Sequence, residues 1–529
     1  MKHLISYLAL SIVISAGLHS QTVYEQTYKF GKVLELIDRF YVDTVNDNKL
    51  VEGAIVEMLK NLDPHSTYIT SDEVKEMNEP LIGNFEGIGI SFNVLNDTIF
   101  VISPVSGGPS EKVGIRAGDR IVKVDDKNVA GIGITTKGVY ELLRGSKGTK
   151  VKVTVVRRNQ NKPIDFTITR DKIPIYSLDA AYMVNDSIGY IKLNRFALTT
   201  MEEFKTALDK LKKEGMTALI LDLTGNGGGY LETAHQLADQ FLGKGKLIVY
   251  TKGLHSERHD YIATQDGDFE KGHLIVLIDE GSASASEIVT GAVQDWDRGI
   301  IVGRRSFGKG LVQRPFLLPD QSMIRLTIAR YYTPTGRLIQ KPYNNGKNAY
   351  DEDIIDRYNN GELMHADSIH FPDSLKYHTL VNSRTVYGGG GIMPDFFIPI
   401  DTSYYSDYYR DIIRKGILNQ FLLEYVDANR VSLRQEYPQF STFDANFKVD
   451  DKLMSKLIRY ATKEGLPENK AGINTSRNEL KLLVKAYIAR DLWNTSEFFE
   501  VLNIRDATFK KAVDVLNNWD HYKSLLKNK

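Results

Sequence analysis

A serine-rich turn is the first stretch of this sequence whose residue types suggest covalent chemistry. The apolar run His273–Ile278 has the composition of a buried strand, and residues 279–286 (DEGSASAS) follow it as a turn into a helical pattern. A helix N-terminus offers free backbone N–H groups and the positive end of the helix dipole. A serine at that place can attack a carbonyl carbon and have the resulting oxyanion stabilised. Ser282, Ser284 and Ser286 are all candidates for this nucleophile.

The general base that such a serine needs is predicted to be a lysine. The chain has 11 histidines, and none of them falls between residues 279 and 313, whereas Lys309 does, within SFGKGLVQ. A lysine accepts a proton only when it is neutral, so burial must lower its pKa well below the ordinary value of about 10.4. The flanking glycines and the apolar side chains of Phe307 and Leu311 favour such a pocket. We expect Gln313, one helical turn further on, to hydrogen-bond the amine and hold it in place.

Taken together, the two segments resemble the signature of the carboxyl-terminal processing (tail-specific) proteases, which are Ser–Lys enzymes. Their Ser-Ala-Ser-Glu core and the later Phe-Gly-Lys-Gly-x-Val-Gln both stand here nearly complete. The resemblance implies that Ser284 is the nucleophile, Lys309 the base and Gln313 the partner that orients the base. Spacing alone does not choose among the three serines. The resemblance implies neither a cofactor nor a metal.

A glycine-rich turn is the candidate for the oxyanion hole. The apolar run ALILDL is followed directly by residues 224–229 (TGNGGG), which lack both the G-x-G-x-x-G order and the lysine of a nucleotide phosphate loop. The protease family carries a similar turn at this place. The resemblance implies that the backbone N–H of Gly228, or else of Gly229, acts together with that of Ala285. A glycine lets its amide approach the substrate carbonyl without an intervening side chain.

Residues 83–173 resemble a PDZ domain. The alternation of strand-like runs around IRAGDRIVKVDD and the helix-like TTKGVYELLRG carry this resemblance. The glycine-rich loop GIGI would offer N–H groups to a terminal carboxylate, and a peptide tail could add beside it as a strand. The predicted peptide-binding residues are Gly87, Ile88, Gly89, Ile90, Val139 and Leu142.

The 529 residues are too many for a single core, so several domains are expected. The predicted fold is a multidomain α/β protein. It has a crotonase- and Clp-protease-like α/β core, an inserted, mainly β PDZ domain, and helical regions at both ends. The expected segments are a signal peptide (1–20), an N-terminal helical region (24–82), the PDZ domain (83–173), the protease core (174–402, with an insertion at 343–386) and a C-terminal helical region (403–529).

The composition of the chain and its N-terminal segment indicate which partners the protein can bind and where in the cell it works. The 67 basic residues balance the 67 acidic ones, which gives no sign of a nucleic-acid partner, and the absence of cysteine excludes disulfides and thiol catalysis. The run LISYLALSIVISAGL after Lys2 and His3 has the length of a secretory signal, so we expect an exported, periplasmic protein. If the signal is not cleaved, the protein stays associated with the membrane. The two histidines of HSERH, expected in a loop, lack the H-E-x-x-H order of a zinc site.

The expected function is that of a serine endopeptidase that recognises proteins by free, unstructured C-terminal tails and processes or degrades them. Two alternatives stay open. One is a PDZ-bearing adaptor or scaffold with an inactive protease-like core, against which the intact Ser284 and Lys309 argue. The other is an acyl hydrolase on the same core, for which a PDZ domain has no evident use. An adaptor protein and a second copy of the chain are further partners that the sequence leaves open.

Overall fold

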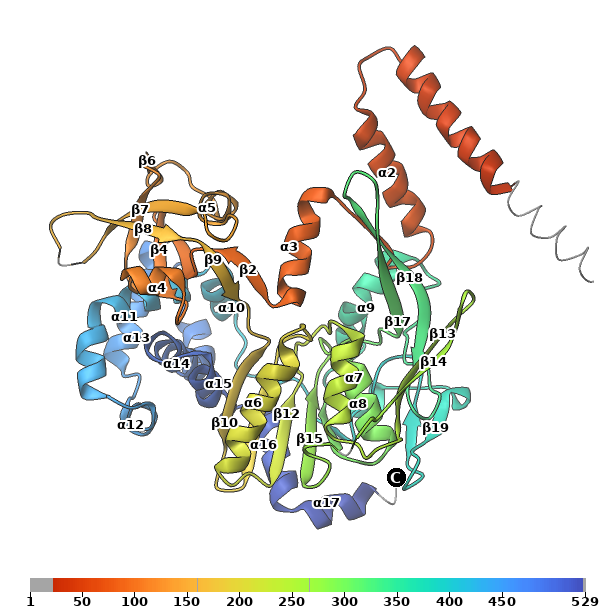
Figure 1. Ribbon diagram of the computed structural model, residues 1–529. Coiled ribbons are helices and arrows are strands. Elements are labelled where there is room, and N and C mark those ends of the chain that lie inside the picture. The colour runs from red at the N-terminus through yellow and green to blue at the C-terminus, as the bar shows by residue number, and fades with distance from the viewer. Residues whose placement is uncertain (1–21, 159, 266, 527–529) are drawn as a thin grey trace, which may run out of the picture.

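The structure of the chain, a computed structural model, describes residues 22–158, 160–265 and 267–526. The expected signal segment, residues 1–20, lies outside the described residues. Residues 22–40 form a helix, and Figure 1 shows it projecting from the molecule as a hairpin with α2 (Asp47–Lys60). After the short strand β1 (Thr67–Ile69), helix α3 (Ser71–Ile82) leads into the PDZ domain. None of the described helices is both long and apolar enough to cross a membrane.

The PDZ domain has a core of apolar side chains between its own sheet and helices. Its sheet has the order β3-β4-β5-β7-β8, so β3 lies at an edge. A separate two-stranded sheet, formed by β2 and β9, closes the domain where the chain enters and leaves it. The elements are β2 (Asn84–Gly87), β3 (Ile90–Leu95), β4 (Thr98–Pro104), α4 (Pro109–Val113), β5 (Arg120–Val124), β6 (Lys127–Asn128), α5 (Thr136–Leu143), β7 (Lys150–Val156), β8 (Ile164–Thr169) and β9 (Asp171–Pro174).

The catalytic core is built on a six-stranded sheet of order β10-β11-β12-β15-β16-β21, parallel except for β10. Apolar side chains of three helices cover one face of this sheet, and those of α16 (Ala507–Asn517) cover the other. Burial on both faces explains the continuous apolar runs of the central strands. The elements are β10 (Leu178–Met183), β11 (Ile188–Leu193), α6 (Thr200–Lys213), β12 (Ala218–Asp222), α7 (Leu231–Asp239), β15 (His273–Ile278), α8 (Ala285–Asp295), β16 (Ile300–Gly303) and β21 (Phe396–Phe397).

A second sheet stands beside the core and carries the segment after the lysine. It joins β1 to β18, β13 and β14, with β17 also paired to β18. The expectation that HSERH forms a loop is wrong, because these residues lie in the antiparallel hairpin of β13 and β14. The elements are β13 (Leu247–Gly253), β14 (Ser256–Ile262), β17 (Leu311–Leu317) and β18 (Met323–Tyr332).

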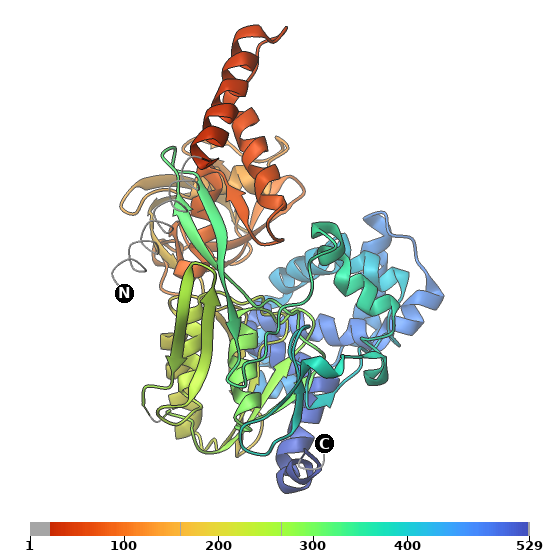
Figure 2. The same cartoon turned by 90° about the vertical axis from the view of Figure 1, so that its right-hand side faces the viewer.

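The segment expected as an insertion packs against the core. In the C-terminal region, residues 407–503 form a helical lobe with its own apolar core (Figure 2), whereas the last two helices pack on the sheet of the catalytic core. Leu423 of this lobe packs against Leu95 and Phe100 of the PDZ domain. The insertion contains α9 (Lys347–Asn359), two 3-10 turns (Ala366–Ser368 and Asp373–Leu375), β19 (Lys376–His378) and β20 (Thr385–Tyr387). The helices of the C-terminal region are α10 (Asp407–Arg414), α11 (Ile417–Glu436), α12 (Phe440–Asn446), α13 (Asp451–Lys463), α14 (Lys470–Leu492), α15 (Thr495–Asn503), α16 (Ala507–Asn517) and α17 (Trp519–Leu526).

Candidate active site

Ser284 stands at the sharp turn between β15 and α8. Its φ of 56° and ψ of −111° are unusual for a residue with a side chain. Such conformations cost free energy and concentrate at functional sites, where the surrounding structure holds them in place. Here the turn directs the serine to the N-terminus of α8, because Ala285 is the first residue of that helix.

Burial separates the three candidate serines. Ser282 and Ser286 are both 0% exposed, whereas Ser284 is only partly buried. The hydroxyl of Ser282 donates to the carbonyl of Leu223, and that of Ser286 donates to the carbonyl of Asn226, both at 2.8 Å. These two serines therefore fasten the nucleophile turn to the glycine-rich turn. Of the three, Ser284 alone keeps its side chain accessible.

Glu287 ties the serine turn to the lysine turn, a role that the sequence analysis missed. One carboxylate oxygen accepts the backbone N–H of Ser284 at 2.8 Å and that of Lys309 at 2.9 Å. The other oxygen accepts the Ser306 hydroxyl at 2.6 Å and the Gly308 N–H at 2.7 Å. Burial raises the pKa of Glu287 to about 7, although these four donors act in the opposite direction. The acidic residue of the Ser-Ala-Ser-Glu core was the only signal for this role in the sequence.

Tyr331 joins the same two turns through their carbonyl groups. Its hydroxyl donates to the carbonyl of Ser284 at 3.0 Å and also contacts the carbonyl of Lys309. The side chain is 1% exposed, and burial raises the pKa of its phenol. Both the amide and the carbonyl of each reactive residue are thus held by a buried side chain.

The surroundings of Lys309 favour a neutral amine. Burial lowers the pKa of Lys309, and the positive charge of Arg325 lowers it further, while Glu287 and Asp63 raise it. In the described part of the chain, the structure records no hydrogen bond from the Lys309 amine. A buried lysine amine with a lowered pKa can accept a proton from a serine hydroxyl, which is the chemistry expected of a general base.

The expectation that Gln313 lies one helical turn after Lys309 is wrong, because Gln313 lies on strand β17. Its side-chain amide donates to the Thr327 hydroxyl at 3.3 Å, and that hydroxyl donates to Asp63 at 3.0 Å. In this conformation Gln313 therefore joins β17 to β18 and to the N-terminal segment. Its direct contact with the lysine amine stays a prediction.

The glycine-rich turn lies against the nucleophile, as the sequence analysis expects, but the predicted N–H donor is occupied. The Gly228 N–H donates to the side chain of Asn226 at 2.9 Å, so Gly228 is not an available oxyanion donor in this conformation. Within residues 22–158, 160–265 and 267–526, the N–H groups of Gly229 and Ala285 have no recorded acceptor. Gly229, the alternative to Gly228, and Ala285 are thus the available pair.

Gly228 is nevertheless expected to be essential, because there is no room for a side chain. A Cβ on Gly228 would lie 2.9 Å from the Cβ of Ser284 and 3.0 Å from the nitrogen of Ala285, and its φ is 102°. We expect Gly228→Ala to displace the nucleophile turn and to lower kcat by about 10²-fold or more. The matched control is Gly227→Ala in the same turn, where a Cβ meets nothing within 4 Å. Equal kcat values for the two variants would contradict this prediction.

The PDZ residues are only partly open to a ligand. Ile88 and Val139 are 2% and 0% exposed and belong to the core of the domain. Ile90 and Leu142 are partly buried, so they alone among the predicted pocket side chains keep exposed surface. Strand β3, which begins at Ile90, is an edge strand with α5 beside it, where Phe92 and Tyr140 meet edge to face at 5.5 Å between ring centroids.

Four family profiles match parts of this chain. The profile of peptidase family S41 matches residues 187–346, and that of the PDZ domain matches residues 87–168. Residues 12–73 match the N-terminal domain of the activating protease CtpB, and residues 408–494 match a family of unknown function, DUF8443.

Individual relatives extend over most of the described chain. The carboxy-terminal-processing protease of Bartonella bacilliformis is 38% identical over 343 residues, which are 63% of this chain and 78% of that protein. The carboxy-terminal processing protease CtpA of Bacillus subtilis is 36% identical over 314 residues, which are 59% of this chain and 66% of that protein. Among solved structures, the photosystem II D1 C-terminal processing protease is 30% identical, with a TM-score of 0.33, and the match covers 58% of this chain and 88% of that one.

Fold and site together define a serine peptidase that carries a PDZ domain. The chain belongs to the carboxy-terminal-processing protease family, within peptidase family S41. The predicted fold class, the PDZ domain and the enzyme class are therefore confirmed.

Proposed function

We propose that this protein is an endopeptidase that binds substrate proteins by free, unstructured C-terminal tails and cleaves them with Ser284 and Lys309. The observation that supports this most directly is the double bridge between the two reactive residues. Glu287 holds both of their amides and Tyr331 contacts both of their carbonyls. A serine and a lysine with a lowered pKa are thereby kept in one fixed unit.

The reaction follows from the properties of these groups. Neutral Lys309 takes the proton of the Ser284 hydroxyl as its oxygen attacks the scissile carbonyl carbon. The N–H groups of Gly229 and Ala285 stabilise the oxyanion. The protonated lysine then gives its proton to the leaving amine, which leaves an acyl-enzyme. Water, activated by the same lysine, releases the acyl group and restores the serine.

Tail recognition is proposed for the PDZ domain. The free edge of β3 can accept an extended peptide as an additional strand, and the loop before it offers backbone N–H groups to a carboxylate. We propose that Ile90 and Leu142, which are partly buried, receive an apolar terminal side chain.

Cleavage of one reporter protein with two versions of its tail tests this proposal. The reporter carries an apolar, unstructured tail that ends in either a free carboxylate or an amide. We expect amidation to raise KM by about tenfold or more, because a charge-assisted contact is lost, while kcat changes little. Ser284→Ala is the inactive reference. Cleavage that ignores amidation would remove the tail-capture role, and binding of the free tail without cleavage by the wild type would favour the inactive adaptor.

Export to the periplasm is part of the proposal and rests on the signal-like N-terminus. The N-terminal helix supports a homo-oligomer, because apolar side chains gather on its surface without cover from the described chain. These exposed residues are Val23, Tyr24, Tyr28, Phe30, Val33, Leu36 and Phe40. An adaptor that brings substrates to the enzyme is a further partner for the same surface.

A further inference from the structure

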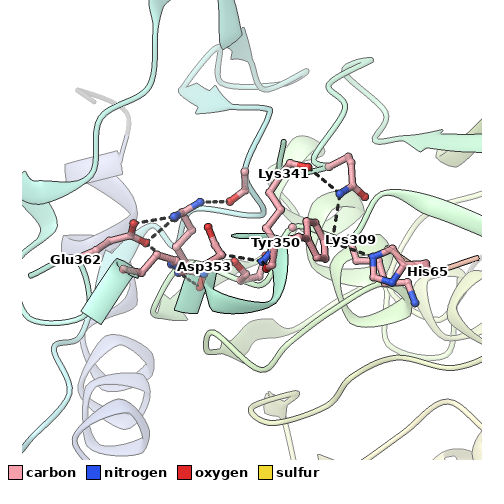
Figure 3. Close-up of polar contacts among 12 residues, drawn as sticks. His65, Lys309, Lys341, Tyr350, Asp353 and Glu362 are labelled. Atoms are coloured by element: carbon pink, nitrogen blue, oxygen red, sulfur yellow. Dashed lines mark hydrogen bonds and ion pairs between the residues drawn. The ribbon is translucent and has the colours of Figure 1, made fainter. Parts of the chain in front are cut away.

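The insertion reaches the turn that carries Lys309. Tyr350 of α9 is 3% exposed, and its ring meets that of Phe307, two residues before Lys309, with 5.8 Å between centroids. The Tyr350 hydroxyl lies 2.8 Å from Nε2 of His65, and Figure 3 shows His65 beside Lys309. A segment of the insertion, a histidine of the N-terminal region and the general base thus meet in one cluster.

The hydroxyl of Tyr350 lies between two polar side chains, those of Gln340 and His65. The side-chain amide of Gln340 donates to the Tyr350 hydroxyl oxygen at 3.3 Å. Burial raises the pKa of Tyr350, so its hydroxyl keeps its proton and forms a hydrogen bond with Nε2 of His65, in which either group donates according to the imidazole tautomer. In either tautomer this hydrogen bond holds the His65 ring in place beside Lys309 (Figure 3).

His65 is a neutral neighbour of Lys309. Burial and then the charge of Lys309 lower the pKa of His65 to about 4, while Asp63 raises it. Lys347 and Lys341 also face His65 and lower its pKa further. At neutral pH the imidazole therefore adds no charge beside the lysine amine (Figure 3).

Tyr350 is itself held firmly. The Lys341 amine lies 4.1 Å from the ring centroids of both Phe307 and Tyr350. It donates to the Tyr350 carbonyl and to Asp353, each at 2.9 Å. The ring can therefore not turn away from His65 without breaking several contacts.

A second residue of the insertion fixes the backbone of the same turn. Arg357 is 3% exposed and donates to the carbonyls of Arg305 at 2.7 Å and Ser306 at 3.2 Å. Glu362 accepts from both Arg357 and Arg305. The insertion is thus attached to the residues that lead directly into Lys309.

We propose that Tyr350, acting through His65, is a positioning residue for the general base: its hydroxyl holds the imidazole as a neutral wall of the Lys309 pocket. This inference rests on the proposed role of Lys309. It gives the insertion a function in the reaction, since without Tyr350 the His65 ring is free to turn and water reaches the amine.

The pH dependence of kcat/KM in the full chain tests this inference with Tyr350→Phe, which removes one oxygen and keeps the ring. In this variant, water that reaches the Lys309 amine raises its pKa, because the effect of burial becomes smaller. The charges of Arg325, Glu287 and Asp63 act on the pKa of Lys309 as they do in the wild type. We expect the acid limb of the profile to move to higher pH by about one unit. At a pH below the limb, kcat/KM then falls by about tenfold, and at high pH it does not change. The loss is expected in kcat and not in KM.

Variants of His65 and a control on α9 complete the test. His65→Ala is expected to move the limb as Tyr350→Phe does, whereas His65→Gln, whose amide oxygen can accept from Tyr350, is expected to stay near the wild type. Tyr358→Phe on the exposed side of the same helix is the matched control and should change nothing. An unmoved limb in both Tyr350→Phe and His65→Ala, or an equal loss at every pH, would overturn the inference. If Tyr350→Phe lowers the melting temperature, the pH profiles of the two His65 variants decide whether the inference holds. Activity that survives in Lys309→Ala would instead remove the proposed function itself.

Discussion

Lys309→Ala is expected to lower kcat/KM by about 10⁴-fold, because general-base catalysis of this kind contributes about 10²–10⁴-fold and the serine is a weak nucleophile without it. The structure makes the lysine suited to this task through burial and the nearby charge of Arg325, both of which lower its pKa. In the wild type, kcat/KM should rise with pH to a plateau, because only the neutral amine accepts the proton. The measurement is the pH profile of reporter cleavage for wild type and variant.

Lys309→Arg separates catalysis by a base from simple stabilisation by a positive charge. A guanidinium keeps its charge at every accessible pH and cannot accept the proton of Ser284. We therefore expect Lys309→Arg to be as inactive as Lys309→Ala. An unchanged melting temperature in at least one of the two variants shows that the loss of activity does not come from unfolding. Substantial activity in Lys309→Arg would mean that the residue acts only as a cation.

The sequence alone was enough to predict a residue's role where a reactive residue type stands within a short local motif. Ser284 and Lys309 lie in short motifs, and the strand before the serine is apolar because both faces of its sheet are covered. The structure adds independent support for Ser284, because the other two serines are buried and hydrogen-bonded.

The errors arose where distant segments decide the local structure. Gln313 was expected on a helix, but pairing of β17 with β18 places it on a strand. Gly228 was predicted as the first oxyanion donor, with Gly229 as the alternative, and in this conformation the Asn226 side chain takes the Gly228 N–H. The importance of Glu287 and Tyr350 depends on contacts across 22 and 285 residues of sequence, which no local pattern reveals.

Glu287→Ala is expected to lower both the stability and the activity strongly. It leaves four buried or partly buried donors without an acceptor, so we expect the free energy of unfolding to fall by about 3–5 kcal/mol. Because the Ser284 and Lys309 turns lose the carboxylate that joins their amides and keep the Tyr331 contact to their carbonyls, kcat should fall by about 10²–10³-fold. Urea unfolding and reporter cleavage measure the two effects. The matched control is Glu280→Gln in the same stretch, which weakens only the partly exposed pair with Arg304.

Glu287→Gln tests whether the carboxylate itself titrates as the protein folds. The folded-state pKa of about 7 lies above the ordinary value of 4.5, so the folded protein binds more protons than the unfolded chain between these pH values. The stability of the wild type relative to Glu287→Gln should therefore increase as the pH falls from 7 to 4.5, by about 1–3 kcal/mol. His65 titrates in both proteins, so its contribution cancels in the difference. A difference that stays flat with pH would mean that the four donors keep Glu287 ionised throughout, and that its bridge between serine and lysine is charged at every pH at which the enzyme works.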